Sequence, residues 1–177
     1  MPRVEAVAID RTDKKLEVLY LDTGKTDSLA YDKLVIATGA TPLIPPIPGV
    51  DLPGVFPVSN LHTAKAIKDI ISKGQVENAV VIGAGAIGIE MAEALGDLWG
   101  IQTTLVEMAD QVLPAALGRN MSRIVEENLK KNDIALMLSE TVQRINGDPE
   151  SGVTSVETSN GTIPCEMVVL ATGVRPN

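Results

Sequence analysis

A glycine-rich segment with the sequence GAGAIG, at residues 83–88, is the clearest chemical pattern in this 177-residue chain. It follows the apolar run of residues 79–82 and has the form G-x-G-x-x-G. Between a strand and a helix, these glycines permit a tight turn, a close approach of the backbone to a pyrophosphate, and close packing of helix on sheet. The free N–H groups and the dipole of the helix then hold the anion. The predicted cofactor-binding residues of this loop are Gly83, Ala84, Gly85, Ile87 and Gly88.

One acidic residue completes the pattern. Glu107 ends the apolar run of residues 103–106 and follows Gly88 by 19 residues, close to the spacing of the acid that binds a ribose in dinucleotide sites. Its carboxylate can accept hydrogen bonds from an adenosine ribose and would repel a 2′-phosphate. The next two residues are uncharged. The spacing therefore predicts NAD(H) rather than NADP(H), and disfavours the alternative of a solvated glutamate at a strand end.

Glu90 lies two residues beyond Gly88, in the first turn of the same predicted helix. A carboxylate there is stabilised by the positive end of the helix dipole. The functional alternative is that Glu90 faces the nicotinamide end of the ligand. From spacing alone, the stabilising role is favoured.

A β-α-β unit is needed to position these residues. Apolar runs indicate strands at 79–82 and 103–107, and a helix from about Ala86 joins them. A second helix is predicted over about 119–131, and further strands around 135–138, 141–145, 153–158 and 167–170. Strands alternating with helices predict a parallel sheet with right-handed crossovers. The residues expected to face inward are Ile87, Met91, Leu95 and Leu98 on the first helix, and Met121, Ile124, Val125 and Leu129 on the second.

An internal repeat indicates the domain organisation. Residues 34–42 read LVIATGATP and residues 168–176 read VVLATGVRP, and each segment follows about 30 residues of antiparallel-looking strands. Each apolar run is expected to form a strand buried on both faces. Six of the 11 prolines fall between Pro42 and Pro57, which predicts an extended linker. Ser59 or Asn60 can cap the helix that follows. We expect the tail of one domain at residues 1–57 and a whole dinucleotide-type domain at residues 58–177.

Composition excludes several classes of function. The net charge of −8 argues against nucleic acid and anionic membrane as partners, and the chain has four aromatic residues. A single His and a single Cys exclude a structural zinc cluster, so no metal site is expected. The absence of an internal disulfide fits a reducing, cytoplasmic location, and no apolar run approaches the length of a membrane span. Cys165 precedes a predicted buried strand and is expected to be a packing residue.

Three motifs together resemble the FAD-dependent pyridine nucleotide-disulfide oxidoreductases. They are YDKLVIATGATPLIPPIPG (31–49), VVIGAGAIGIEMAEAL (80–95) and VVLATGVRPN (168–177). The stretch LPGVFPVSNLHTAKAI (52–67) is most similar to the branch with NADH oxidases, NADH peroxidases and coenzyme A-disulfide or persulfide reductases. The resemblance implies an α/β, Rossmann-like FAD/NAD(P)-binding fold, with a parallel sheet, flanking helices and a β-meander.

The resemblance also implies roles for individual residues. It assigns Gly83, Gly85 and Gly88 to the NAD pyrophosphate and Glu107 to the adenosine ribose. It places Glu90 near the nicotinamide–flavin contact, which reverses the preference drawn from spacing. The backbone at Gly173 is implied to line the NAD site, and Thr38 and Gly39 to approach the FAD nucleotide.

The expected function is that of an NAD(H)-binding domain. The family's FAD-binding glycine loop, redox-active cysteine and dimerisation domain are absent from these residues, so no catalytic residue is expected here beyond a nicotinamide contact at Glu90. The full-length protein is expected to be a homodimeric enzyme that passes hydride from NADH to FAD and electrons to a thiol or disulfide, persulfide, peroxide or oxygen acceptor, whereas this chain alone is expected to be inactive. The alternative is a non-enzymatic NADH-binding or redox-sensing module.

Overall fold

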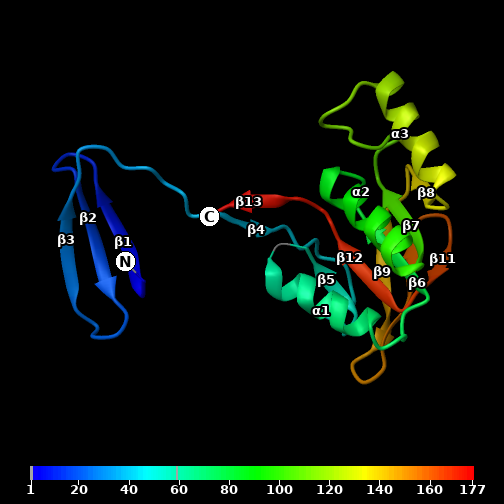
Figure 1. The fold of residues 1–177 in the computed structure, drawn as a ribbon, viewed down its shortest axis with the longest axis horizontal. Helices are drawn as coiled ribbons and strands as arrows, with labels where there is room; N and C mark the ends of the chain where they lie inside the picture. Colours follow the sequence, from blue (N-terminus) through cyan, green and yellow to red (C-terminus); the bar gives the residue numbers. More distant parts are fainter. Residues whose placement is uncertain (1, 59) are drawn as a thin grey trace. The chain divides into compact units, whose positions relative to one another are not determined.

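The computed structural model describes residues 2–58 and 60–177 and divides them into two compact units, Met1–Thr38 and Gly39–Asn177 (Figure 1). The unit of residues 2–38 is an antiparallel sheet of three strands, β1 (Val4–Asp10), β2 (Lys15–Tyr20) and β3 (Thr26–Ala30), in the order β1-β2-β3. Among its described residues only Val18 is buried. The antiparallel strands expected before residues 34–42 are therefore confirmed.

A parallel sheet of five strands is the centre of the second unit. Its strand order is β5-β12-β6-β7-β8, and all four neighbouring pairs are parallel. Sheets of this kind are covered on both faces, which is why their strands are almost entirely apolar. The strands are β5 (Val55–Pro57), β6 (Asn78–Ile82), β7 (Gln102–Glu107), β8 (Ala135–Leu138) and β12 (Met167–Leu170).

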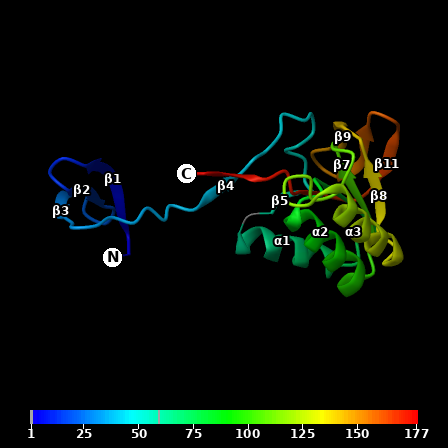
Figure 2. The same cartoon turned by 90° about the horizontal axis from the view of Figure 1, so that it is seen from above.

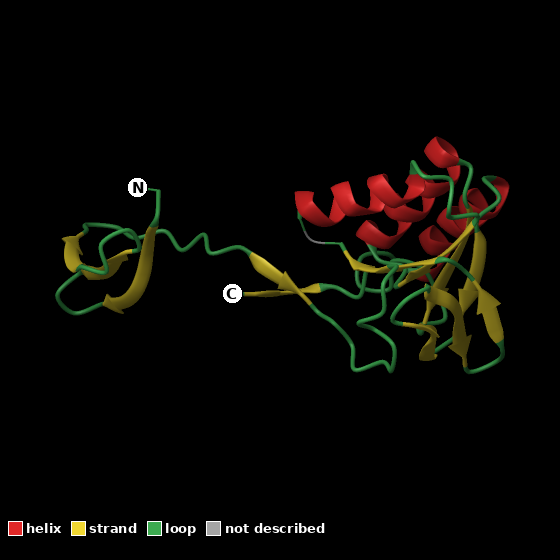
Figure 3. Ribbon diagram, turned by 90° about the horizontal axis from the view of Figure 1, so that it is seen from below, coloured by secondary structure: helices red, strands yellow, loops and turns green. Residues whose placement is uncertain are grey.

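Helices cover one face of this sheet and an antiparallel meander covers the other (Figures 2 and 3). Alternate residues of one strand serve the two layers: Val81 of β6 packs among the helices, whereas Val80 packs against the meander. The helices are α1 (Leu61–Ile71), α2 (Ala86–Glu93), which continues as a π-helical segment (Ala94–Leu98), and α3 (Arg119–Lys131). The meander consists of β9 (Val142–Asp148), β10 (Gly152–Thr158) and β11 (Thr162–Pro164).

Most of the predicted elements are confirmed, and with them the predicted fold class. The helix over 119–131 and the strands at 135–138 and 167–170 have the expected bounds. Asn60 caps α1, because its side chain accepts a hydrogen bond from the N–H of Thr63 at 3.0 Å; Ser59, the other predicted cap, lies outside the described residues. The domain boundary between residues 57 and 58 stays a prediction.

The first half of the internal repeat behaves differently from the second. β12 is buried between β5 and β6, but the matching residues 34–37 form no strand, and Val35 is 85% exposed. The prediction of a buried strand there is wrong, because a strand needs at least one hydrogen-bonded neighbour and the described residues supply none at 34–37.

The proline-rich stretch is more structured than the expected linker. It contains β5 and β4 (Ala40–Pro42), and β4 pairs antiparallel with β13 (Val174–Pro176). Ile47, Val50 and Leu52 pack against the core under the meander. Proline is tolerated in β5 because this strand lies at the edge of the sheet.

Two helix faces also differ from the prediction. On α2 and the segment after it, Met91 and Leu95 face the core as expected, but Ile87 and Leu98 are exposed. The buried positions include Gly88, Ile89 and Ala92, so small residues as well as large ones face the core. On α3 the expected inward positions Met121 and Ile124 are exposed, and the buried residues are Ser122, Glu126 and Leu129.

Candidate dinucleotide site

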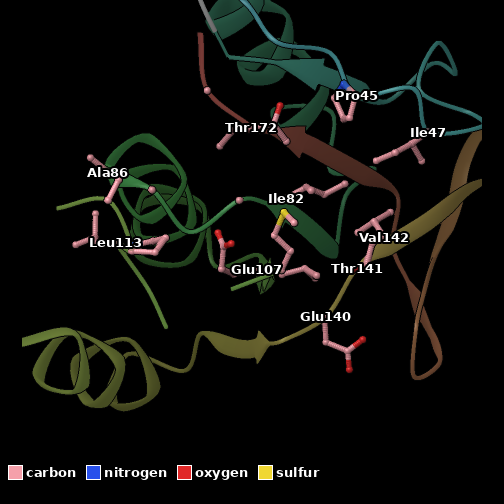
Figure 4. Close-up of a pocket in the computed structure, with 18 of the residues that line it drawn as sticks. Pro45, Ile47, Ile82, Ala86, Glu107, Leu113, Glu140, Thr141, Val142 and Thr172 are labelled. Atoms are coloured by element: carbon pink, nitrogen blue, oxygen red, sulfur yellow. The ribbon is translucent and has the colours of Figure 1, made fainter. Parts of the chain in front are cut away.

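A cavity of about 610 Å³ opens at the carboxyl ends of the parallel strands (Figure 4). This edge of an open parallel sheet is where α/β proteins bind their ligands. Four segments of the second unit supply its walls: the glycine loop with the end of β7, the loop between β7 and α3, the connection from β8 to β9, and residues after β12 with part of the proline-rich stretch. The lining residues are Pro45–Ile47, Ile82, Gly83, Gly85, Ala86, Val106–Met108, Leu113–Ala116, Glu140–Val142 and Ala171–Gly173.

Gly83 is the residue at which the chain turns from β6 towards α2. Its φ of +103° lies in the region that favours glycine. A Cβ at this position would lie 2.6 Å from the carbonyl oxygen of Ala171. The close approach of the loop to the end of β12 therefore depends on glycine here, as the motif predicts.

Gly85 begins α2 and leaves space beside it. Its backbone is extended, with φ of −76°, and no side chain caps the helix. An added Cβ would meet no atom within 4 Å, so neither backbone strain nor packing requires glycine at this position. The open space lies in the cavity wall beside the first N–H groups of α2, which have no intrahelical partners. This arrangement fits a phosphate group at the helix N-terminus.

Glu107 is fixed beside the loop by two backbone hydrogen bonds. Its Oε2 accepts from the N–H of Ala84 at 2.7 Å and its Oε1 from the N–H of Ala109 at 2.9 Å. The residue is only 9% exposed, and its carboxylate is directed towards the loop leading into α2 (Figure 4). Each oxygen keeps a further lone pair that can accept from a hydroxyl group. None of the residues lining the cavity is Lys or Arg, so this wall offers no cation to a 2′-phosphate.

Comparison with known proteins identifies the family and the fold. The family model described as pyridine nucleotide-disulphide oxidoreductase matches residues 1–177. This chain belongs to the pyridine nucleotide-disulphide oxidoreductase family. The resemblance inferred from the three motifs is therefore confirmed.

Individual members of the family cover nearly all of the chain. A protein of Methanocaldococcus jannaschii named NADH oxidase is 41% identical over 174 residues, which are 98% of this chain and 38% of that protein. An NAD(P)H coenzyme A polysulfide/persulfide reductase of Pyrococcus horikoshii is 40% identical over 91% of this chain and 37% of its own. The structure of an NAD-dependent persulfide reductase from A. fulgidus matches with a TM-score of 0.83 at 39% identity, over 98% of this chain and 31% of that one. The chain thus spans about 38% of the length of the curated relatives it matches.

Sequence reasoning missed the cavity walls supplied by loops. The segment between β7 and α3 contributes Leu113 to Ala116, and the N–H of Leu113 donates to the carbonyl oxygen of Ala84 at 2.8 Å. The position of these residues after the carboxyl end of a strand was the available signal, because the loops at this edge form the ligand sites of such sheets. Their side chains carry no motif that could have named them.

Glu140 adds a second carboxylate at the rim of the cavity, where it points outward (Figure 4). A hydrogen bond from the side chain of Asn160 lowers the pKa of Glu140, and one from Ser159 acts in the same direction. The carboxylate is therefore ionised at neutral pH and adds to the negative charge of this opening.

Of the remaining predicted residues, one lines the cavity and the others do not. Gly173 lines the cavity, with φ of +99°. Gly88 is buried, and a Cβ there would collide with the carbonyl oxygen of Gly83, so its role is to let α2 pack against the loop. Besides Gly88, five predicted residues are not in the cavity lining, and their roles stay predictions: Ala84, Ile87, Glu90, Thr38 and Gly39.

Cys165 is buried among the residues between the sheet and the meander. Burial, together with the neighbouring Glu166, raises the pKa of its thiol to about 12. The thiol is therefore protonated at neutral pH and unreactive, since the thiolate is the nucleophile.

The described residues, 2–58 and 60–177, hold no cluster of three or more His, Cys, Asp and Glu side chains suited to a metal ion. None of their helices has both the length and the apolar character needed to cross a bilayer.

Proposed function

We propose that this chain binds NAD(H) in the cavity at the carboxyl edge of its parallel sheet, as the dinucleotide-binding part of an FAD-dependent oxidoreductase. The observation that carries the proposal is the open space beside Gly85 at the uncapped start of α2, in a cavity that is also lined by Glu107 with its fixed carboxylate. A pyrophosphate fits the start of α2, and an adenosine ribose fits the carboxylate of Glu107. The names of the relatives, which mention NADH, NAD(P)H or NAD, support the same ligand.

The residues of this chain bind and orient the ligand. The N–H groups at the start of α2 hold the pyrophosphate, and Glu107 accepts hydrogen bonds from the ribose hydroxyls. From there the cavity extends to Gly173, where the nicotinamide end is expected. The family resemblance implies a nicotinamide contact at Glu90 as well, although this residue is not in the cavity lining. NADH supplies a hydride and FAD accepts it when both are bound. Thr38 and Gly39 are expected to approach the FAD nucleotide in the full-length protein.

The activity of a longer protein follows from the family as a proposal. We expect a homodimeric, cytoplasmic enzyme that reduces a disulfide, persulfide, peroxide or oxygen with electrons from NADH. The 177-residue chain alone is expected to bind NADH without consuming it, and steady NADH oxidation by flavin-free protein would contradict this. The relatives named above are oxidoreductases, so they give no support to a non-enzymatic sensing module.

Calorimetric titration with NADH and NADPH tests the proposed ligand. We expect the unaltered chain to bind NADH more tightly. Glu107→Ala should narrow the NADH/NADPH preference about tenfold, because it removes a charge that faces the 2′-phosphate. Glu150→Ala is the matched control, since it removes an exposed carboxylate from the turn between β9 and β10. Equal affinity of the unaltered chain for both ligands would show that Glu107 has been assigned the wrong role.

A further inference from the structure

Helix α3 buries polar side chains where apolar ones were expected. Ser122 is 0% exposed and Glu126 is 8% exposed, while Met121 and Ile124 of the same helix lie at the surface. A buried hydroxyl or carboxylate is costly unless it is hydrogen-bonded. Polar residues at positions where the pattern predicts apolar ones are expected at functional or strained sites. The partners of Ser122 and Glu126 therefore indicate what this face of α3 does.

Both side chains bind the backbone of the loop between β7 and α3. The hydroxyl of Ser122 donates to the carbonyl oxygen of Val112 at 2.8 Å. Oε1 of Glu126 accepts a hydrogen bond from the backbone N–H of Val112 at 3.4 Å. Gln111 joins them, because its side-chain amide donates to Ser122 Oγ at 3.0 Å and to the carbonyl oxygen of Leu117 at 2.9 Å. Both backbone groups of Val112 are thus held by one helix.

The contacts continue from Val112 to the glycine loop. The next residue, Leu113, donates its N–H to the carbonyl oxygen of Ala84 at 2.8 Å. Ala84 in turn donates its own N–H to Glu107 at 2.7 Å. Leu113 adopts φ of +50°, an uncommon conformation for a residue with a side chain. A loop in this conformation needs external contacts to hold it, and α3 supplies them.

We propose that Ser122 and Glu126 are positioning residues that hold residues 111–117 as a preformed wall of the dinucleotide cavity. Neither residue lines the cavity; they act through Val112 on Leu113 to Ala116, which do. A wall that is ordered before the ligand arrives does not lose conformational freedom on binding, so affinity rises. The wall adjoins Glu107, so the adenosine half of the ligand benefits. This inference rests on the proposed binding of NAD(H).

The test compares ligand affinity in variants of the 177-residue chain. Ser122→Ala removes a single oxygen atom and leaves the Val112 carbonyl without its partner. Glu126→Leu removes the acceptor for the Val112 N–H, whereas Glu126→Gln keeps an acceptor oxygen at the same place. We expect Ser122→Ala and Glu126→Leu each to weaken the binding of NADH about tenfold, because each leaves a buried backbone group of Val112 unpaired. In each variant, the binding of ADP-ribose should weaken by the same factor as the binding of NADH. Glu126→Gln should bind within about twofold of the unaltered chain.

A control separates positioning from general loss of stability. Val156→Ala creates a cavity in the core under the meander, at a residue that does not line the dinucleotide site. It should lower the unfolding temperature and leave NADH affinity unchanged at temperatures where the chain is folded. Equal weakening by Val156→Ala, failure of Glu126→Gln to restore binding, or a loss for NADH without a loss for ADP-ribose would each overturn the positioning role.

Two results distinguish this inference from the proposed function. If the folded Ser122→Ala and Glu126→Leu variants bind NADH as tightly as the unaltered chain, the positioning role is wrong and NAD(H) binding stands. If the unaltered chain binds neither NADH nor ADP-ribose, the proposed function is wrong and the positioning role falls with it.

Discussion

The three motif glycines do different work at the scale of single residues. Gly83 and Gly88 are required by the fold, because a Cβ at either would collide with a backbone carbonyl group. Gly85 is not required by the fold, since its backbone is extended and the space beside it is open. Under the proposed function, the ligand occupies this space and explains the glycine at position 85. The structure thus separates two glycines that the fold requires from one that it does not, which the motif alone could not do.

This difference predicts opposite outcomes for two alanine substitutions. Gly85→Ala should change the free energy of unfolding by less than ~1 kcal/mol, because alanine adopts this conformation without strain. It should nevertheless weaken NADH binding at least ~tenfold, since the methyl group occupies the space of the pyrophosphate. Gly88→Ala should cost ~2 kcal/mol or more of stability through overpacking. Chemical denaturation and NADH titration of both variants provide the measurement; strong NADH binding by Gly85→Ala would contradict the placement of the pyrophosphate.

At the scale of secondary-structure elements, α3 shows how an apolar pattern can mislead. Met121, Ile124 and Val125 suggested the inward face, and of these Val125 packs against the core, together with Leu129. The helix is turned so that Ser122, Glu126 and Leu129, at spacings of four and three residues, lie inward. The loop before α3 contains buried backbone groups at Val112 that need polar partners. Hydrogen bonds to these backbone groups stabilise the fold more than burial of the exposed side chains of Met121 and Ile124 would.

Stability measurements on α3 check this orientation. Ile124→Gln should change the free energy of unfolding by no more than ~0.5 kcal/mol, because Ile124 is 60% exposed. Leu129→Ala should cost ~2–5 kcal/mol, because Leu129 is fully buried in the core of the second unit. The sequence-based inward face gives a different expectation, in which both substitutions are severe. Urea denaturation of the two variants distinguishes these orientations.

At the scale of the whole molecule, the sequence was informative where a local pattern determines the structure. Several patterns can be recognised from residues that are close in the sequence: the glycine loop, the spacing to Glu107 and the continuous apolar runs at 79–82 and 167–170. These patterns predicted the β-α-β unit and the proposed position of the site. Contacts between distant segments could not be predicted in the same way. The pairing of β5 with β12, the cavity wall at Leu113 and the exposure of residues 34–37 depend on which partners the rest of the chain supplies.

The two compact units should differ in their ability to fold alone. The unit Met1–Thr38 buries only Val18 among its described residues, and a small sheet with so little core is not expected to be stable in water. The unit Gly39–Asn177 supplies every residue of the two apolar cores around the parallel sheet. Every residue that lines the cavity lies between Pro45 and Gly173. We therefore expect the second unit to account for both the stability and the proposed ligand binding.

A truncated chain of residues 39–177 tests this assignment. It should unfold cooperatively and bind NADH with a dissociation constant within about twofold of the intact chain, because it keeps both cores and the entire cavity wall. A peptide of residues 1–38 should show no cooperative transition. Circular dichroism during thermal unfolding and NADH titration give the two readouts. A truncated chain that folds but has lost NADH affinity would show that the first unit contributes to the site, whereas a truncated chain that does not fold would show that residues 1–38 stabilise the second unit.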